Sequence, residues 1–203
     1  PPISTLFPYT TLFRSLAALV GKPEMIEMVN FQFDDPGSGE KRMGGYSDTH
    51  GVFDLPLEAF VRVIMDFDSY HRFNNRIFES EVTGRAEDYW LVRYKVGISF
   101  LGFKVAYDTV EESVVRNFPD GSFLIAGRLV ESPDGNLFEH YTSTYLEPVM
   151  VNGRPMTYVR SLNRPGVRKP FPGMLAISKT FTPGESRAQM NGLAKEAAKR
   201  AKP

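Results

Sequence analysis

The chain has 203 residues, and its 24 Lys and Arg residues balance 24 Asp and Glu residues, so the formal net charge is zero. A neutral chain argues against nucleic acid or an anionic membrane surface as the main partner. Cysteine is absent, which excludes disulfides, thiolate metal sites and cysteine nucleophiles, and no apolar run approaches the ~20 residues of a membrane-spanning helix.

The first fifteen residues stand apart from the rest of the chain. Residues 1–15, and residues 5–15 most closely, resemble the conceptual translation of a sequencing adapter, and no initiator methionine precedes them. Such a segment is left out of fold reasoning. We therefore expect a soluble protein whose true N-terminus is missing, with the cytoplasm and the periplasm both open as its compartment. Residues 16–40 are expected to form an N-terminal arm, in which residues 29–33 alternate weakly like an edge strand.

A strand and two short helices are predicted next. Residues 41–53 form the first main strand, in which Gly44 and Gly45 suit a bulge or bend. The period then changes, because apolar residues recur at helical spacing over residues 57–67. After a break, a second short helix is expected over residues 70–78.

The clearest pattern is a pair of alternating strands over residues 90–98 and 103–109, which face each other across a turn at residues 101–102. On the first strand Arg93 and Lys95 lie on one face. The other face carries apolar side chains, namely Val92, Tyr94, Val96 and Ile98. Further strands are predicted over residues 122–130, 137–146 and 157–162. The Gly- and Pro-containing turns between them indicate an antiparallel meander.

The C-terminal part of the chain is predicted to be helical. Helical periodicity begins over residues 174–181, and residues 182–185 match a capping box that would begin a second helix over residues 188–201. Residues 41–203 therefore form an α+β domain. A sheet with one large apolar face must be covered, and one helix laid across a long curved sheet leaves a hollow. The sequence thus predicts a cavity for an apolar guest.

Several segments follow the pattern of one superfamily. They are residues 51–56 leading into the first helix, residues 63–70, Phe73, residues 77–82, the run of strands and the closing helix over residues 172–198. Over residues 41–201 the chain thereby resembles the START-like, or SRPBCC, superfamily with its helix-grip fold. The resemblance implies a curved antiparallel sheet wrapped around a long C-terminal helix, two short helices after the first main strand, and a deep pocket. Members bind sterols, other lipids, polyketides, plant hormones or quinones, and some are cyclases or aromatases.

The expected ligand-binding side chains lie on the inward faces of these elements. From the strands they are Val92, Tyr94, Val96, Ile98, Phe103, Val105, Tyr107, Ile125 and Arg160, and from the terminal helix Met174, Ile177, Phe181, Met190 and Leu193. Tyr94 and Tyr107 either pack against a backbone partner or present their hydroxyls to a ligand. An inward Arg160 needs an anionic ligand head or, as the favoured alternative, a carboxylate from Glu111, Glu112 or Glu139.

No catalytic or metal-binding pattern stands out. His50, His71 and His140 lie in different elements and in no metal-ligand motif, so we expect imidazoles at the surface. Asp66 and Asp68 would point apart on a helix, which fits capping better than paired-carboxylate chemistry. Neither a catalytic residue, a metal nor a cofactor is expected.

Three functions stay open. The favoured one is a non-enzymatic protein that binds or transfers a hydrophobic small molecule, with transient membrane contact and the oligomeric state left open. The second is a polyketide cyclase or aromatase that uses the same pocket. The third is a structural or chaperone-like module, whose pocket is filled by its own side chains and whose residues 171–181 contact a protein partner.

Overall fold

Over residues 15–100 and 103–201, which the computed structural model describes apart from the side chains of residues 98–100 and 103–104, the chain forms one eight-stranded antiparallel sheet. The strands are β1 (Glu24–Asp34), β2 (Lys41–Phe53), β3 (Ile77–Arg85), β4 (Tyr89–Phe100), β5 (Phe103–Asn117), β6 (Phe123–Glu131), β7 (Leu137–Val151) and β8 (Arg154–Arg168). The helical segments are the 3-10 turn η2 (Leu16–Leu19), α1 (Leu57–Ile64), the 3-10 turn η3 (Phe67–Arg72) and α2 (Met174–Arg200).

The sheet is built mainly from hairpins. Its order is β1-β2-β8-β7-β6-β5-β4-β3, so β2 and β8 are the neighbours that do not follow each other in the chain. Between β7 and β8, Asn152 and Gly153 both adopt positive φ angles of 50° and 75°. A two-residue turn of that kind matches the twist of the strands that it joins. The predicted antiparallel meander is confirmed, with β7 and β8 longer than the sequence indicated.

The edge strand predicted within residues 29–33 is confirmed and is longer, because β1 pairs with β2 from Glu24 to Asp34. The bulge expected at Gly44 and Gly45 is absent from this pairing, whose shift of register lies between Met25 and Glu27. The two glycines have another role. A Cβ on Gly45 would overlap the carbonyl oxygen of Val29, so glycine there lets β1 approach β2 closely.

The two short helices after β2 are confirmed, but the second is a 3-10 turn that ends earlier than predicted. Its end is fixed by Asn74, whose backbone N–H donates to the Tyr70 carbonyl at 2.9 Å. The Asn74 side-chain oxygen accepts from the backbone N–H of Arg76 at 3.0 Å. Such a local bond competes with helix and turns the chain into an extended segment, so β3 begins at Ile77.

The C-terminal helix is continuous from Met174 to Arg200, with Pro183 inside it, so the predicted capping box is wrong. Proline lacks an N–H and therefore removes one intrahelical hydrogen bond. The would-be capping carboxylate of Glu185 instead accepts a hydrogen bond from Asn75 at 2.9 Å. Ser178, about two turns before Glu185, accepts from Asn30 of β1 at 3.0 Å. Contacts on both sides of Pro183 hold the helix in place.

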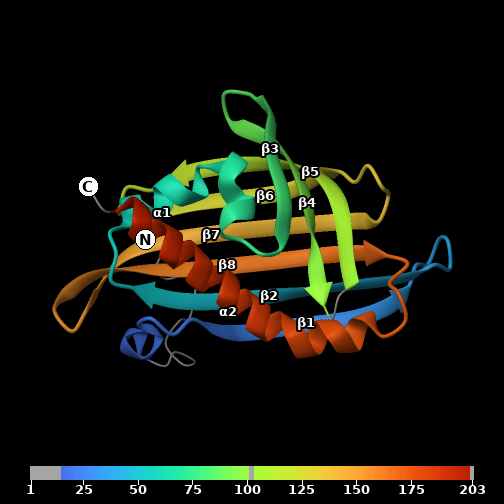
Figure 1. Cartoon of the computed structure of the whole chain (residues 1–203), viewed down its shortest axis with the longest axis horizontal. Helices are drawn as coiled ribbons and strands as arrows, with labels where there is room; N and C mark the ends of the chain where they lie inside the picture. Colours follow the sequence, from blue (N-terminus) through green and yellow to red (C-terminus); the bar gives the residue numbers. More distant parts are fainter. Residues whose placement is uncertain (1–14, 101–102, 202–203) are drawn as a thin grey trace.

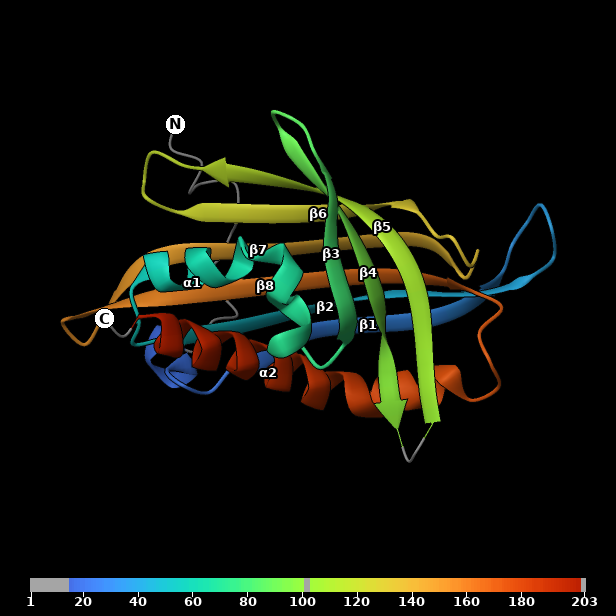
Figure 2. The same cartoon turned by 45° about the horizontal axis from the view of Figure 1, so that its top comes forward.

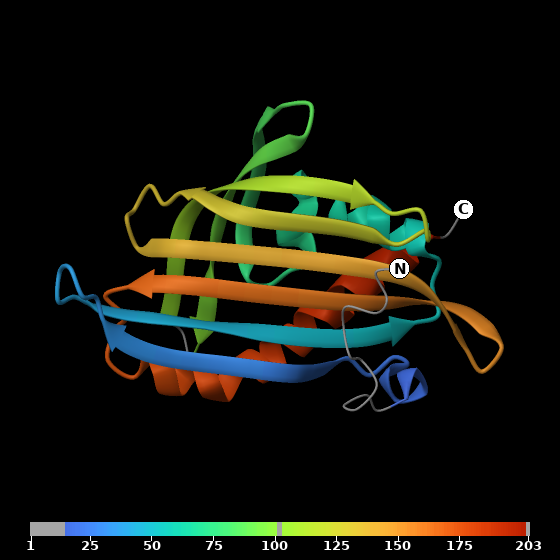
Figure 3. The ribbon, with the colours of Figure 1, turned by 180° about the vertical axis from the view of Figure 1, so that it is seen from behind.

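All three of α1, η3 and α2 lie on one face of the sheet (Figure 1), and the view from behind shows the other face in front of them (Figure 3). The ends of β3, β4 and β5 curl over toward the N-terminal part of α2, as Figures 1 and 2 both show. The sheet and α2 thus form two sides of a hollow. This is the curved sheet and long helix that the helix-grip fold predicted.

The apolar side chains form separate cores on the two faces. The main core joins α1, the sheet and the C-terminal half of α2, with Phe60, Val92, Val159 and Ala197 fully buried. On the opposite face, Leu19 of η2 packs against Val52 and Tyr158. Among the described residues, no helix combines the length and the apolar character needed to cross a lipid bilayer.

Candidate functional site

A cavity of about 260 Å³ lies between the concave face of the sheet and α2. Its apolar wall combines aromatic rings and aliphatic side chains from β2, η3, the strands from β3 to β8, and α2. Among them are Met43, Phe67, Tyr70, Ile77, Tyr94, Val96, Val105, Tyr107, Ile125, Leu137, Val167, Met174, Ile177 and Phe181. Strand alternation explains the wall, because every second residue of β4 and β5 faces the helix.

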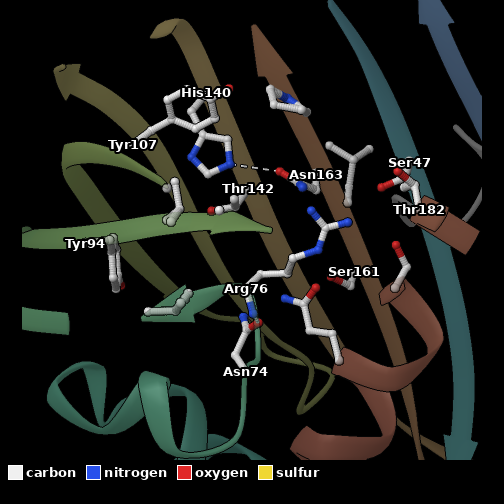
Figure 4. Close-up of a pocket in the computed structure, with 18 of the residues that line it drawn as sticks. Ser47, Asn74, Arg76, Tyr94, Tyr107, His140, Thr142, Ser161, Asn163 and Thr182 are labelled. Atoms are coloured by element: carbon white, nitrogen blue, oxygen red, sulfur yellow. Dashed lines mark hydrogen bonds between the residues drawn. The ribbon is translucent and has the colours of Figure 1, made fainter. Parts of the chain in front are cut away.

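Eight of the side chains expected to bind a ligand line this cavity in the described part of the chain. They are Tyr94, Val96, Val105, Tyr107, Ile125, Met174, Ile177 and Phe181. Burial raises the pKa of the Tyr94 and Tyr107 hydroxyls above that of a free phenol, so both stay protonated near neutral pH. Neither hydroxyl has a hydrogen-bond partner among the described residues, and Figure 4 shows both rings at the cavity.

The other expected ligand-binding residues lie elsewhere. Val92 is fully buried in the main core. Met190 and Leu193 also belong to that core, because this part of α2 packs against α1. Both residues line a smaller pocket of about 60 Å³ beside the cavity. The side chains of Ile98 and Phe103 are outside the described residues.

Arg160 lies on the face of the sheet away from α2. Its guanidinium makes a bidentate contact with Asp48, with Nε 3.0 Å and Nη2 2.7 Å from the carboxylate oxygens. Glu111, Glu112 and Glu139 are therefore not its partners. The same group extends to His50, whose Nε2 is 3.0 Å from Asp48 Oδ1 and whose Nδ1 is 2.7 Å from the Tyr158 hydroxyl. This buried network joins β2 to β8 on the face that η2 covers.

A polar group in the cavity wall was not predicted. Glu111 of β5 and His140 of β7 are both buried, and Glu111 Oε1 lies 2.7 Å from His140 Nδ1. His140 Nε2 lies 2.9 Å from Asn163 Oδ1 on β8, the contact drawn as a dashed line in Figure 4. The Thr109 hydroxyl donates to Glu111 at 3.2 Å.

Both ring nitrogens of His140 face oxygen atoms, so an imidazolium satisfies both contacts. Burial by itself lowers the pKa of His140, but the Glu111 carboxylate and the contact with Asn163 outweigh it, and the pKa is raised. The expectation of surface histidines is therefore wrong for His140 and His50, while His71 is exposed. Side chains alternate between the two faces of β5, so the inward positions of Tyr107 and Thr109 could have predicted that Glu111 also points inward.

Arg76 also lines the cavity and was missed, because the sequence placed it in a helix. It stands just before β3, and its Nε lies 3.5 Å from Glu185 Oε2 of α2. Among the described residues no group of three or more His, Cys, Asp or Glu side chains is arranged to hold a metal ion.

Neither a model of a known protein family nor the sequence of a curated protein matches this chain. Solved structures do match. Human StAR-related lipid transfer protein 5 superposes with a TM-score of 0.62 at 13% identity, over 84% of this chain and 86% of that one. A STAR-related lipid transfer protein from Xanthomonas axonopodis has a TM-score of 0.60 at 11% identity, over 84% and 93% of the two chains. The chain has the START-like helix-grip fold.

The Zhui aromatase/cyclase from Streptomyces sp. R1128 shares this fold, with a TM-score of 0.57 at 14% identity over 77% of this chain and 95% of that one. At such identities the likeness covers the fold and not the function. The comparison therefore gives the fold of this chain, whereas the chemistry of the cavity depends on the side chains that line it here. The polar ones that decide this chemistry are Arg76, Glu111, His140, Tyr94 and Tyr107.

Proposed function

We propose that the protein binds or carries a hydrophobic small molecule, of the lipid, sterol, quinone or polyketide kind, in the cavity between the sheet and α2. The observation that carries the proposal is the cavity itself, about 260 Å³ of space walled by aromatic and aliphatic side chains. Ligand sites are typically concave and combine apolar surface with polar groups that orient the ligand. This cavity has such an apolar wall, and its lining also includes Ser, Thr and Asn side chains of β7, β8 and α2. Two of the solved structures that share the fold are named as lipid transfer proteins.

Apolar burial is enough to hold a guest. A molecule that buries about 200 Å² of apolar surface gains roughly 5 kcal/mol, from which the loss of its free motion is subtracted. Tyr94 and Tyr107 then orient the guest through their hydroxyls. The same cavity argues against the third function, a module whose pocket is filled by its own side chains.

Native mass spectrometry of the purified protein tests this proposal. A co-purified apolar molecule is expected, or thermal stabilisation by members of a panel of lipids, quinones and aromatic compounds. Ser161→Leu adds bulk at the cavity wall, where the Ser161 side chain has no hydrogen-bond partner among the described residues. This variant should fold and lose binding by about tenfold or more. Thr180→Leu places a leucine on the exposed side of α2 instead and should bind normally. Failure of every compound to bind the folded wild type would refute the proposal.

The buried Glu111–His140 pair favours a second candidate, an acid–base enzyme of the cyclase or aromatase type. An imidazolium held against a carboxylate in the wall of this cavity is suited to exchange a proton with a bound carbonyl compound. The test is the exchange of the α-hydrogens of an aromatic 1,3-diketone in deuterated water, followed by NMR. A rate increase that His140→Asn abolishes supports an enzyme, and no increase leaves binding alone.

A further inference from the structure

Arg76 brings a positive charge into a cavity that is otherwise mostly apolar. The residue stands at the junction of η3 and β3, and 29% of its side-chain surface is exposed. Figure 4 shows the side chain extending from this junction into the cavity, toward the side on which Asn163 of β8 lies. A guanidinium carries five N–H donors and no acceptor, so this part of the cavity attracts ligand atoms that accept hydrogen bonds.

The protein satisfies only part of this guanidinium. Glu185 Oε2 lies 3.5 Å from Arg76 Nε, and the same oxygen accepts a hydrogen bond from Asn75 at 2.9 Å. The two terminal nitrogens of Arg76 have no acceptor among the described residues. Burial lowers the pKa of Arg76 and Glu185 opposes that effect, as expected of a cation that its surroundings compensate incompletely.

Apart from Glu185, the described charged groups of the cavity wall provide no further acceptor for Arg76. Glu111 Oε1 lies 2.7 Å from His140 Nδ1, and when His140 is protonated its charge balances that of the Glu111 carboxylate. The Asn163 oxygen accepts from His140, so the Asn163 amide nitrogen is a second donor without an acceptor in the described part of the chain. A guest with a hydrogen-bond acceptor is therefore favoured, and an anionic acceptor most of all.

The size of the cavity limits the guest further. An apolar cavity of about 150 Å³ accommodates benzene, so the present 260 Å³ suits a molecule of roughly two fused six-membered rings. A four-ring sterol or a lipid with two acyl chains would have to extend beyond this space, so among the guests proposed above the smaller ring compounds fit it best.

We propose, on the basis of the binding function above, that the guest is a small organic acid with a ring system of this size, whose carboxylate contacts the terminal nitrogens of Arg76. The rings lie against the aromatic wall of Tyr94 and Tyr107. The carboxylate receives charge-assisted hydrogen bonds, which are roughly twice as strong as neutral ones. The chain selects its guest by charge at one end and by ring size at the other.

The test compares two probes that differ in charge and hardly in shape. Ionised naphthoic acid and neutral naphthamide, substituted at the same ring carbon, are titrated into the full-length protein by calorimetry near neutral pH. The wild type should bind the acid about tenfold more tightly than the amide. Arg76→Gln should remove this preference by weakening the acid alone, and Arg76→Lys should keep part of it. Arg93→Gln removes the same charge from the exposed side of β4 and should leave the preference unchanged.

The outcomes separate the two proposals. If neither probe nor any neutral apolar compound binds the folded protein, the binding function itself fails. If naphthamide binds as tightly as naphthoic acid, or if Arg76→Gln keeps the preference for the acid, the guest is bound but the role of Arg76 is refuted. Circular dichroism and the midpoint of thermal unfolding of each variant show whether a loss of affinity comes from misfolding.

Discussion

Glu111 Oε1 and His140 Nδ1 lie 2.7 Å apart although their strands, β5 and β7, are separated by β6. Glycine at position 127 of β6 contributes to this arrangement. A Cβ there would come within 2.7 Å of the Thr142 hydroxyl and 3.4 Å of Glu111 Oε2. The missing side chain leaves room for the carboxylate to reach across β6, and the ion pair becomes part of the cavity wall.

This pair predicts a pH dependence of stability. Because the pKa of His140 is raised on folding, the folded state holds a proton that the unfolded chain releases above its ordinary value of 6.5. The stabilisation is complete below that value and is lost as the pH rises through the folded pKa. We expect the free energy of unfolding, measured with urea, to fall as the pH is raised from 6.5.

His140→Asn is the matched control for this dependence, since it cannot take up a proton. Its free energy of unfolding should lack the decline assigned to His140, and NMR titration of the wild-type imidazole should give a pKa above the ordinary value. A wild-type profile that the variant reproduces would contradict the assignment.

Arg160→Met is expected to reduce stability and to leave ligand affinity within about twofold. The substitution removes the bidentate partner of Asp48, whose side chain is only 10% exposed. A buried acceptor left without its donor costs about 1–3 kcal/mol. Urea unfolding and calorimetric titration with one ligand measure the two effects separately. A loss of affinity without a loss of stability would mean that Arg160 reaches the cavity after all.

The sequence predicted the fold correctly for strands that bury only one of their two faces. On β4, Val92, Tyr94 and Val96 alternate with the polar Arg93 and Lys95, so the period of two identifies the inward face. On β8 the apolar residues Tyr158 and Val159 are neighbours, because η2 covers one face of the sheet and α2 the other. Alternation alone then cannot tell which way Arg160 points.

The polar part of the cavity was harder to predict for a different reason. Arg76 belongs to a segment whose helical spacing ends at Asn74, where one side-chain hydrogen bond redirects the chain. His140 and Glu111 come together across an intervening strand, and pairing of that kind depends on the register of the whole sheet. The continuity of α2 through Pro183 depends on contacts with β1 and with Asn75, which local propensity does not contain.

Neighbouring glycines of β2 provide a matched pair of stability tests. At Gly45 a Cβ would overlap the Val29 carbonyl of β1, and backbone cannot move aside without breaking the pairing. At Gly44 the nearest atom is the end of the Phe31 ring at 3.3 Å, and that side chain is exposed and free to turn. We expect Gly45→Ala to cost about 1–3 kcal/mol in urea unfolding and Gly44→Ala less than about 1 kcal/mol. Equal costs would show that β1 does not need the close approach.

Glu185→Gln should strengthen the binding of organic acids, the reverse of the effect of Arg76→Gln. Glu185 is the carboxylate beside Arg76, and glutamine keeps an oxygen that can still accept from Asn75. Removing the negative charge leaves the Arg76 guanidinium without its protein counter-charge. A ligand carboxylate then no longer competes with the Glu185 carboxylate for Arg76. Calorimetry should show an affinity for naphthoic acid that rises by about threefold to tenfold, with the affinity for naphthamide unchanged. An equal gain for both probes would indicate a general widening of the cavity mouth, and no gain would mean that Glu185 does not compete for Arg76.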